Sequence, residues 1–350
     1  MVNQMVDVRW ERYPRVAGSG TARAWLTIQA NLGLAANTVE AYGRALEDYL
    51  AFSAGRSVVP ETTGREHVAA YVRDLASRPH PRGKNVVVID SGTGLANATL
   101  QQRLTAVRLF YDYLMEEGVR TTNPVGRGRY TPRRGFGGSR GLVPRFRKLP
   151  WIPNDQQWQS ILTAARSQGW RNRVMFALAY DAGLRREELC SLETADIDPA
   201  HRVLRIRAET TKNRQERVVP YSEAAGELYV QYLRHRREFC KDRGRLFVSE
   251  SRRNRGWPIS IWTWSKAITE MARDADVPQF TTHTLRHLCL TDLARSNWDI
   301  RQIATFAGHR CLQTTLLYIH LSGHELVEKL AKGMDEIHAW RVKTLAEILQ

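Results

Sequence analysis

The sequence lacks a long apolar run, and its four cysteines are widely separated along 350 residues. No stretch approaches the roughly 18 apolar residues of a membrane span, so we expect no membrane-embedded segment and no membrane partner. The cysteines form no CxxC pair, so the ligand spacing typical of a zinc site is absent. Free thiols in a reducing compartment are favoured instead. The first residues are charged and do not resemble an export signal, so a cytoplasmic, nucleoid-associated protein is expected.

Lysine is also scarce, with eight lysines beside 44 arginines, although the formal net charge is +16 and the isoelectric point is about 10.1. A GC-rich genome explains the ratio of arginine to lysine but not the net excess of positive charge. A field of this sign favours a polyanion as partner. Because no basic amphipathic membrane helix is apparent, double-stranded DNA or another nucleic acid is favoured over a membrane surface.

Helical patterns dominate the first part of the chain. Asn37 with Glu40 three residues later resembles a capping box, and apolar residues at helical spacing follow as far as Phe52. Two further amphipathic helices are predicted over 65–77 and 98–118, with a loop rich in proline and glycine between them. This part of the chain therefore predicts a small all-helical domain.

A basic, glycine-rich segment follows this domain. Residues 124–150 hold eight basic residues and no acidic one. A solvated linker and a strap lying along DNA phosphates are equally good interpretations, and both predict a domain boundary. The DNA-binding residues predicted here, together with one in the second half, are Arg133, Arg134, Arg145, Arg147, Lys148 and Arg214.

The second half predicts helices and a small antiparallel sheet. Helices are expected over 154–168 and 171–183 and again from Ser260 onward. Strands are expected over 201–210 and 215–221, around a short turn, and 245–251 is either an edge strand or a connector. Trp257, Trp262 and Trp264 are assigned to the core or its edge. The predicted fold class is mainly α with a small antiparallel β-sheet.

Four short stretches in this half carry groups suited to phosphate chemistry. "AGLRREEL" places Arg185 just after Gly183, and "TKNRQERVVP" places a lysine at the tip of the hairpin. "HTLRH" places His283 and Arg286 three residues apart, on one face of a helix. In "AGHRCLQTTLLYIH" a tyrosine follows a Gly-His pair by nine residues. Each stretch alone has an ordinary structural explanation, such as a surface charge, a helix cap or a core aromatic.

In this order and at this spacing, the residues resemble the tyrosine recombinase family, also called the lambda-integrase or Xer-like recombinases. The resemblance covers roughly residues 20–330 and implies a helical core-binding (SAM-like) domain followed by an α+β catalytic domain. It implies these catalytic residues: Arg185, Lys212, His283, Arg286, His309 and Tyr318. It also implies two supporting residues, Glu188 and His287. The domain boundaries that we expect are an extension over 1–20, a core-binding domain over 21–124, a linker over 125–150, a catalytic domain over 151–334 and a C-terminal helix over 335–350.

The chemistry explains the residue types. A tyrosine hydroxyl attacks the phosphodiester and a 5′ oxygen leaves, which conserves the bond energy in a 3′-phosphotyrosyl link. Two arginines can hold the non-bridging oxygens of the transition state. The family assigns protonation of the leaving oxygen to the hairpin lysine, here Lys212. We expect His283 to assist proton movement at Tyr318 and His309 to hydrogen-bond a phosphate oxygen. No metal, ATP or other cofactor is expected, because the cationic side chains take the place of metal ions.

The chain departs from the shortest Xer-like members in three places. It has the extra loop near 80–98, the long basic linker, and 32 residues after Tyr318. These features favour an integrase or transposase of a mobile element over a chromosome-dimer resolvase. The expected partners are DNA, a homotetramer on paired recombination sites in which the helix over 335–350 passes to a neighbour, and further recombinases or a directionality factor.

Two alternatives remain open at this point. A type IB topoisomerase shares the same active-site chemistry but relaxes DNA as a monomer, without strand exchange. A DNA-binding accessory protein that has lost catalysis would share the domains, although the intact set of six residues argues against it.

Overall fold

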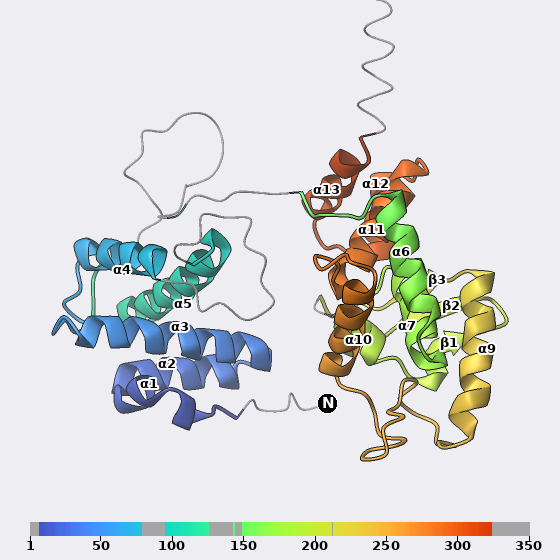
Figure 1. Cartoon of the computed structure of the whole chain (residues 1–350). Coiled ribbons are helices and arrows are strands. Elements are labelled where there is room, and N and C mark those ends of the chain that lie inside the picture. The colour runs from blue at the N-terminus through green and yellow to red at the C-terminus, as the bar shows by residue number, and fades with distance from the viewer. Residues whose placement is uncertain (1–6, 79–94, 126–142, 144–148, 212, 324–350) are drawn as a thin grey trace, which may run out of the picture. The chain divides into compact units, whose positions relative to one another are not determined.

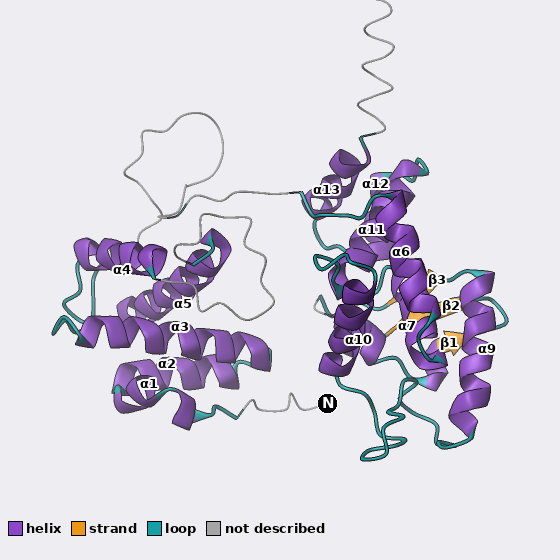
Figure 2. Cartoon of the chain, in the orientation of Figure 1, coloured by secondary structure: helices purple, strands orange, loops and turns teal. Residues whose placement is uncertain are grey.

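The computed structural model describes residues 7–78, 95–125, 143, 149–211 and 213–323. The chain divides into two compact units, residues 1–147 and 148–350 (Figure 1). Helices predominate in both, and the strands of the described residues all belong to the second unit (Figure 2). This confirms the predicted fold class. None of the helices in the described ranges has the length and hydrophobicity needed to span a bilayer.

The first unit is a bundle of helices. Its elements are η1 (Trp10–Arg12), α1 (Pro14–Gly18), α2 (Gly20–Asn31), α3 (Ala36–Ala54), α4 (Arg65–Ser77) and α5 (Asn97–Glu116). The long helices α3 and α5 pack against each other, and α1 and α2 pack on α3. Aromatic side chains fill the centre, and the hydroxyls of Tyr49 and Tyr111 satisfy each other there in a hydrogen bond of 2.7 Å. Tyr13 and Val16, within the predicted extension over 1–20, are buried in this same core.

The start of α3 differs from the prediction. Asn37 does not cap the helix, which begins one residue earlier and has no side-chain cap at Ala35. Glu40 does not reach back to the helix start, because its carboxylate binds the guanidinium of Arg12. A contact with a distant segment thus replaces the local capping box that the sequence suggested.

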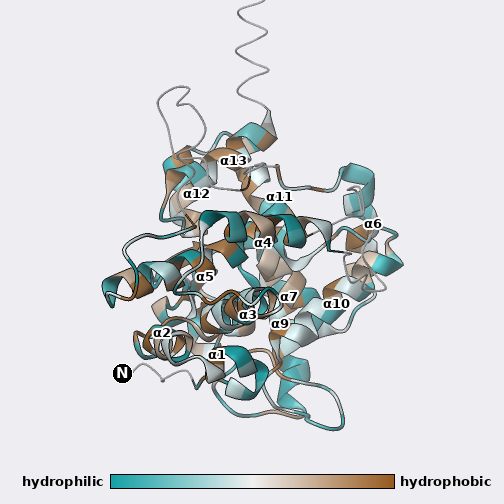
Figure 3. Ribbon diagram, turned by 90° about the vertical axis from the view of Figure 1, so that its left-hand side faces the viewer, coloured by the Kyte–Doolittle hydropathy of each residue, from teal (hydrophilic) through white to brown (hydrophobic). Residues whose placement is uncertain are grey.

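The second unit surrounds a small sheet with helices. Its helices are α6 (Asp155–Arg166), α7 (Trp170–Asp181), α8 (Arg186–Cys190), η2 (Thr194–Asp196), η3 (Ala208–Thr210), α9 (Glu223–Arg237), α10 (Ile261–Asp274), α11 (Thr282–Arg295), α12 (Ile300–Ala307) and α13 (Leu312–Ser322). Its strands are β1 (Ile197–Asp198), β2 (Val203–Ile206) and β3 (Arg217–Pro220). Many of these helices carry hydrophilic and hydrophobic residues along the same ribbon (Figure 3), as expected for helices with one buried face.

The strands form an antiparallel sheet in the order β1-β2-β3. Leu204 of β2 pairs with Ile197 on one side and with Val219 on the other, and all three side chains are buried. The strands are shorter than predicted, and β1 was not predicted, because two residues are too few for a recognisable alternation. The segment 245–251 is a connector, held by isolated bridges and not by a ladder.

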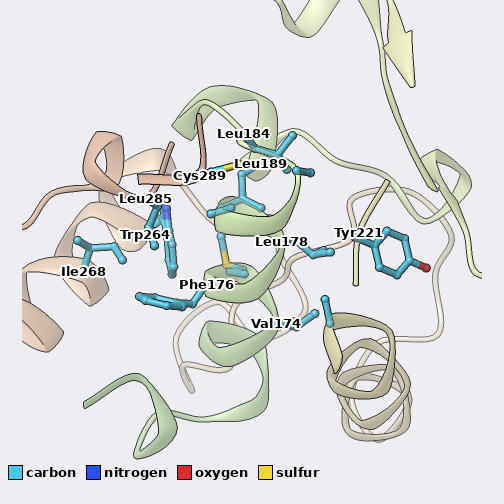
Figure 4. Close-up of a cluster of buried hydrophobic side chains, with 14 of the residues drawn as sticks. Val174, Phe176, Leu178, Leu184, Leu189, Tyr221, Trp264, Ile268, Leu285 and Cys289 are labelled. Atoms are coloured by element: carbon cyan, nitrogen blue, oxygen red, sulfur yellow. The ribbon is translucent and has the colours of Figure 1, made fainter. Parts of the chain in front are cut away.

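Helix α7 forms the centre of the core of the second unit. Val174, Phe176 and Leu178 lie along α7, with Trp264 and Leu285 beside them (Figure 4). These last two side chains come from α10 and α11, and α11 packs directly against α7. The ends of α7 and α11 are thereby brought to the same region of the unit, where the candidate site lies.

Two of the three tryptophans that the sequence assigned to the core are on the surface. Trp264 is buried, whereas Trp257 and Trp262 are each 71% exposed. The assignment was wrong for these two because the apolar stripe of α10 passes through Trp264, Ile268 and Met271, which places Trp262 on the opposite face.

Two glycines with left-handed backbone allow helices to end beside the candidate site. Gly183 follows α7 with a φ of +53°, and a Cβ there would lie 3.2 Å from the ring of Phe306. Gly308 caps α12 with a φ of +63°, and a Cβ there would lie 3.1 Å from the guanidinium of Arg217. Both positions therefore need glycine for its backbone and for the space.

We expect Gly183→Ala to destabilise the second unit by about 1–2 kcal/mol from backbone strain alone. Gly226→Ala is the matched control, because Gly226 lies inside α9 and its added Cβ would make only an ordinary contact at 3.5 Å. That change should stabilise the helix by up to about 1 kcal/mol. Urea unfolding of the full-length chain measures both, and equal effects of the two substitutions would contradict the assignment of strain to Gly183.

Candidate active site

The carboxylate of Glu188 lies at the bottom of the site, where it binds two arginines. Glu188 is 1% exposed and lies in the first turn of α8. Arg217 of β3 donates to both of its oxygens, at 3.1 and 2.7 Å, and Arg185 donates from Nη1 at 2.8 Å and from its backbone N–H at 3.0 Å. Burial raises the pKa of this carboxyl, but the bonds to Arg217 and Arg185 outweigh it and lower the pKa to about 2. Glu188 therefore stays ionised at neutral pH and holds two cations.

Arg286 lies beside this cluster and is 3% exposed. Its guanidinium donates to the carbonyl oxygens of Gly183, two residues after the end of α7, and of Ala307, the last residue of α12. It also donates to Nε2 of His309 at 3.0 Å. Burial and the nearby charge of Arg185 lower the pKa of Arg286 to about 10, so the group remains charged at neutral pH. Three segments distant in sequence thus meet at this guanidinium.

His309 is neutral and its tautomer follows from its partners. Burial, together with Arg286 and Arg185, lowers its pKa to about 3. Because Nε2 accepts from Arg286, the ring proton sits on Nδ1, which donates to the Thr315 hydroxyl at 2.9 Å. The expectation for His309 was a hydrogen bond to a phosphate oxygen. In the structure both of its nitrogens are engaged with protein groups.

Tyr318 comes from α13 and is 3% exposed. Its ring stacks on that of His309, with an interplanar angle of 9° and centroids 5.9 Å apart. Its hydroxyl is hydrogen-bonded to Nδ1 of His287 at 3.0 Å. Burial raises the pKa of this phenol, and the nearby charges of Arg286 and Arg185 oppose the rise. The hydroxyl is therefore protonated at neutral pH and faces an imidazole.

The two histidines of α11 make different contacts from those suggested by the sequence. His287 was expected only to support the site, yet it contacts the Tyr318 hydroxyl. His283 was expected to assist the proton of Tyr318, yet it is exposed, and its ring forms no hydrogen bond within the described residues. The ring centroids of the two histidines lie 5.9 Å apart, one helical turn along α11.

The hairpin between β2 and β3 reaches the same region. Asn213 donates to the carbonyl oxygen of Gly308 at 3.0 Å, which ties the hairpin to the turn that carries His309. Lys212 itself lies outside the described residues. Arg214 is exposed, with a φ of +53°. The other predicted DNA-binding residues all lie outside the described residues: Arg133, Arg134, Arg145, Arg147 and Lys148.

The sequence interpretation missed two arginines near the site. Arg217, read only as part of a strand, holds Glu188 and also donates from Nε to the carbonyl oxygen of Phe306 at 3.0 Å. Arg186 donates to Ser265 of α10 at 3.1 Å, and its guanidinium lies 5.6 Å from the ring centroid of Trp262. The only signal for Arg217 was its position two residues before Val219, which places both side chains on the buried face of β3.

The arrangement brings five of the six predicted catalytic residues into one region: Arg185, His283, Arg286, His309 and Tyr318. Two guanidinium groups lie near a phenol and two neutral imidazoles, around one buried carboxylate. Such a set can bind an anion through the guanidinium groups and supply a nucleophilic oxygen with a proton acceptor beside it. Within the described ranges, no group of three or more His, Cys, Asp or Glu side chains is arranged to hold a metal ion.

Comparisons with known families cover both units. The Phage integrase family matches residues 153–325, and the family described as "Phage integrase, N-terminal SAM-like domain" matches residues 24–118. The XerD tyrosine recombinase of Caulobacter vibrioides is 30% identical over 320 residues, which cover 88% of this chain and 94% of that protein. The XerC tyrosine recombinase of Mycobacterium bovis is 28% identical and covers 79% of this chain and 92% of its own length.

Solved structures share the fold. The XerH site-specific recombinase bound to its palindromic difH substrate has a TM-score of 0.67 at 16% identity, covering 96% of this chain and 92% of that one. The Tn1549 transposon integrase in complex with a circular intermediate DNA has a TM-score of 0.61 at 15% identity, covering 89% and 99%. The matched domains and the extent of the similarity to XerD lead to one conclusion: the chain belongs to the tyrosine recombinase family of site-specific recombinases.

Proposed function

We propose that this recombinase cuts and rejoins DNA through a covalent 3′-phosphotyrosyl link to Tyr318, without metal or ATP. The observation that carries the proposal is the position of the Tyr318 hydroxyl. It lies beside a neutral imidazole, and its ring stacks on a histidine that is bonded to Arg286. These surroundings suit an attacking phenol, because nearby guanidinium groups stabilise negative charge on its oxygen and a neutral imidazole can accept its proton.

The two arginines bind the scissile phosphate in this proposal. Arg185 is 20% exposed at its side chain, so it faces an incoming anion, and Arg286 lies behind it. Both are held in place by protein acceptors before DNA arrives, so little reorganisation is needed in the transition state. Lys212, in the hairpin that Asn213 ties to the site, protonates the leaving 5′ oxygen.

The surface next to Arg185 extends the DNA-binding face onto α10. Arg186 follows Arg185 directly and lies against the exposed ring of Trp262. A duplex whose phosphate is bound at Arg185 passes over this neighbouring pair, which offers a cation and an aromatic surface. The basic segment 124–150 supplies further phosphate contacts in this proposal, along with Arg214.

The biological role that we propose is integration or transposition of a mobile element. The support is the sequence itself: the extra loop near 80–98, the basic linker and the residues after Tyr318 distinguish it from the shortest Xer-like members. Two duplexes require four strand cuts, and each subunit offers one Tyr318, so a homotetramer forms on paired sites. In this tetramer the apolar residues of the helix predicted over 335–350 bind the neighbouring subunit. Other recombinases or a directionality factor bind to the tetramer.

Tyr318→Phe should abolish formation of the covalent protein–DNA adduct on a nicked suicide duplex while leaving DNA binding unchanged, because only the attacking oxygen is lost. The wild-type reaction should proceed in excess EDTA without ATP, since the guanidinium groups supply the positive charge. Denaturing gels measure the adduct and gel shifts measure binding. An adduct with the Phe variant, or a strict Mg²⁺ requirement for cleavage, would refute the proposal. Relaxation and recombination assays on the wild type separate a recombinase from a type IB topoisomerase.

Replacing Arg133, Arg134, Arg145 and Arg147 with Gln tests the basic segment. Each phosphate contact contributes about 0.9 to the slope of log K against log salt, so the slope should fall in magnitude by up to about 3.6. Binding should weaken equally on specific and random duplexes, because phosphate contacts carry no sequence information. Fluorescence anisotropy at several salt concentrations gives the slope. An unchanged slope would show that this segment is a solvated linker.

A further inference from the structure

Thr315 is a fully buried threonine of α13 whose hydroxyl bonds outside its own helix. It is hydrogen-bonded to Nδ1 of His309, in the turn before α13, at 2.9 Å. A threonine inside a helix commonly bonds to the carbonyl oxygen four residues before it, as Thr291 of α11 does with His287 at 2.8 Å. The bond of Thr315 to a side chain beyond its helix therefore calls for a separate explanation.

The imidazole of His309 connects this hydroxyl to an arginine of the site. Its Nε2 accepts from Arg286, so its ring proton is on Nδ1 and the Thr315 hydroxyl accepts it. Burial, with the charges of Arg286 and Arg185 nearby, lowers the pKa of His309 to about 3. At neutral pH, Nε2 thus carries no proton that would oppose the arginine, and one neutral ring joins α13 to a guanidinium of α11.

Arg286 is held by three acceptors in all. The carbonyl oxygen of Gly183 accepts from Nη1, whereas the carbonyl oxygen of Ala307 and Nε2 of His309 both accept from Nη2. Three of the five N–H groups of the guanidinium are thereby engaged, which fixes its plane. In the proposed function the remaining N–H groups bind oxygens of the scissile phosphate, so their direction depends on these three acceptors.

The same ring also contacts Tyr318. Thr315 and Tyr318 are three residues apart and both are buried, so they lie on one face of α13. His309 stacks its ring on Tyr318 and donates from its edge to Thr315. Packing of α13 against α11 and α12 therefore places the tyrosine and completes the acceptor set of Arg286 together.

We propose that Thr315 is a positioning residue for DNA cleavage: its hydroxyl holds His309 where Nε2 aligns Arg286 on the scissile phosphate. The proposal rests on the proposed function, in which Tyr318 attacks a phosphate that Arg286 binds. It adds that the anion site is complete only when α13 is docked, because one of the acceptors of Arg286 is held from that helix. The nucleophile and the phosphate-binding group are thus assembled by a single packing event.

The test compares Thr315→Val with Thr315→Ser in single-turnover cleavage of a nicked suicide duplex by the full-length protein. Valine keeps the shape of threonine but leaves a buried N–H of His309 without an acceptor, whereas serine keeps the hydroxyl. The Val variant should cleave about tenfold more slowly with an unchanged Kd for the duplex, and the Ser variant should cleave like wild type. Thr291→Val is the matched control, because it removes a buried hydroxyl with a local partner, and its rate should equal that of wild type.

A second substrate tests whether the effect passes through Arg286. A duplex with a methylphosphonate at the scissile position carries no charge there, so alignment of a guanidinium gains little. The tenfold ratio between wild type and Thr315→Val should shrink to about twofold on this substrate. An undiminished ratio would show that Thr315 acts on Tyr318 and not on the phosphate-binding arginine, which would overturn the proposal.

Nitrogen-15 NMR of the histidine rings gives a readout that does not depend on activity. His309 should show a proton on Nδ1 that exchanges slowly with water in the wild type and in Thr315→Ser. In Thr315→Val this slow exchange should be lost. Unchanged exchange in the Val variant would contradict the role of the hydroxyl.

Thermal unfolding and gel shifts identify the variants that fold and bind DNA. Thr315→Cys is the companion variant in case the Val protein does not fold, and it should also cleave slowly, because a thiol is a weak acceptor. A wild-type rate in either folded variant would overturn the proposal, as would a Ser variant as slow as the Val variant. An adduct formed by Tyr318→Phe would instead refute the proposed function itself, so the two failures are distinguishable.

Discussion

The buried carboxylate of Glu188 is the interaction on which the rest of the site depends. A carboxylate that is 1% exposed is stable only when cations and hydrogen bonds replace its water, and Arg185 and Arg217 do so here. Because these arginines come from the start of α8 and from β3, the one carboxylate joins the helical and sheet parts of the second unit. Arg217 also binds the end of α12 through the Phe306 carbonyl, so the turn that carries His309 is fixed by the same cluster.

The helix ends complete the arrangement. The left-handed glycines let the chain turn after α7 and α12, where the carbonyl oxygens of Gly183 and Ala307 accept from Arg286. A buried guanidinium thus finds acceptors without a second carboxylate. An arginine so held by neutral groups keeps its full charge for an anion. Its bond to His309 fixes the tautomer of that ring, which in turn stacks on Tyr318. Tyr318 is therefore positioned by a chain of contacts that begins at Glu188.

The sequence predicted the fold class and the residues that share a motif, but not how separate motifs meet. Arg185, Arg286 and Tyr318 could be named because their motifs occur in the order and at the spacing of a known family, although each motif alone has an ordinary structural explanation. Arg217 could not, because the partner of a strand residue depends on which helix covers the sheet. The contact of Tyr318 with His287, where the sequence suggested His283, has the same origin. Spacing gives the two histidines nearly the same helix face, and only the position of α13 decides which one reaches the tyrosine.

The misassigned tryptophans have a related cause. Trp257 and Trp262 are exposed whereas Trp264 is buried, and hydropathy alone does not reveal which of several aromatic residues faces the core. At Asn37 a distant contact replaced a local one. The sequence predicted a capping box with Glu40, but the Glu40 carboxylate binds Arg12 instead.

The most direct test of the account is the single-turnover cleavage rate of Glu188→Gln compared with Glu223→Gln. Glu223 is exposed on the first turn of α9 and pairs with Arg202 on the surface, so it is a control for the loss of one carboxylate charge. The amide at 188 turns an N–H₂ group toward guanidinium donors and removes the charge that holds Arg185 and Arg217. We expect cleavage to fall on the order of 10²-fold with DNA binding retained, while the control stays near wild type. Equal rates for the two folded variants would contradict the claim that this carboxylate organises the site.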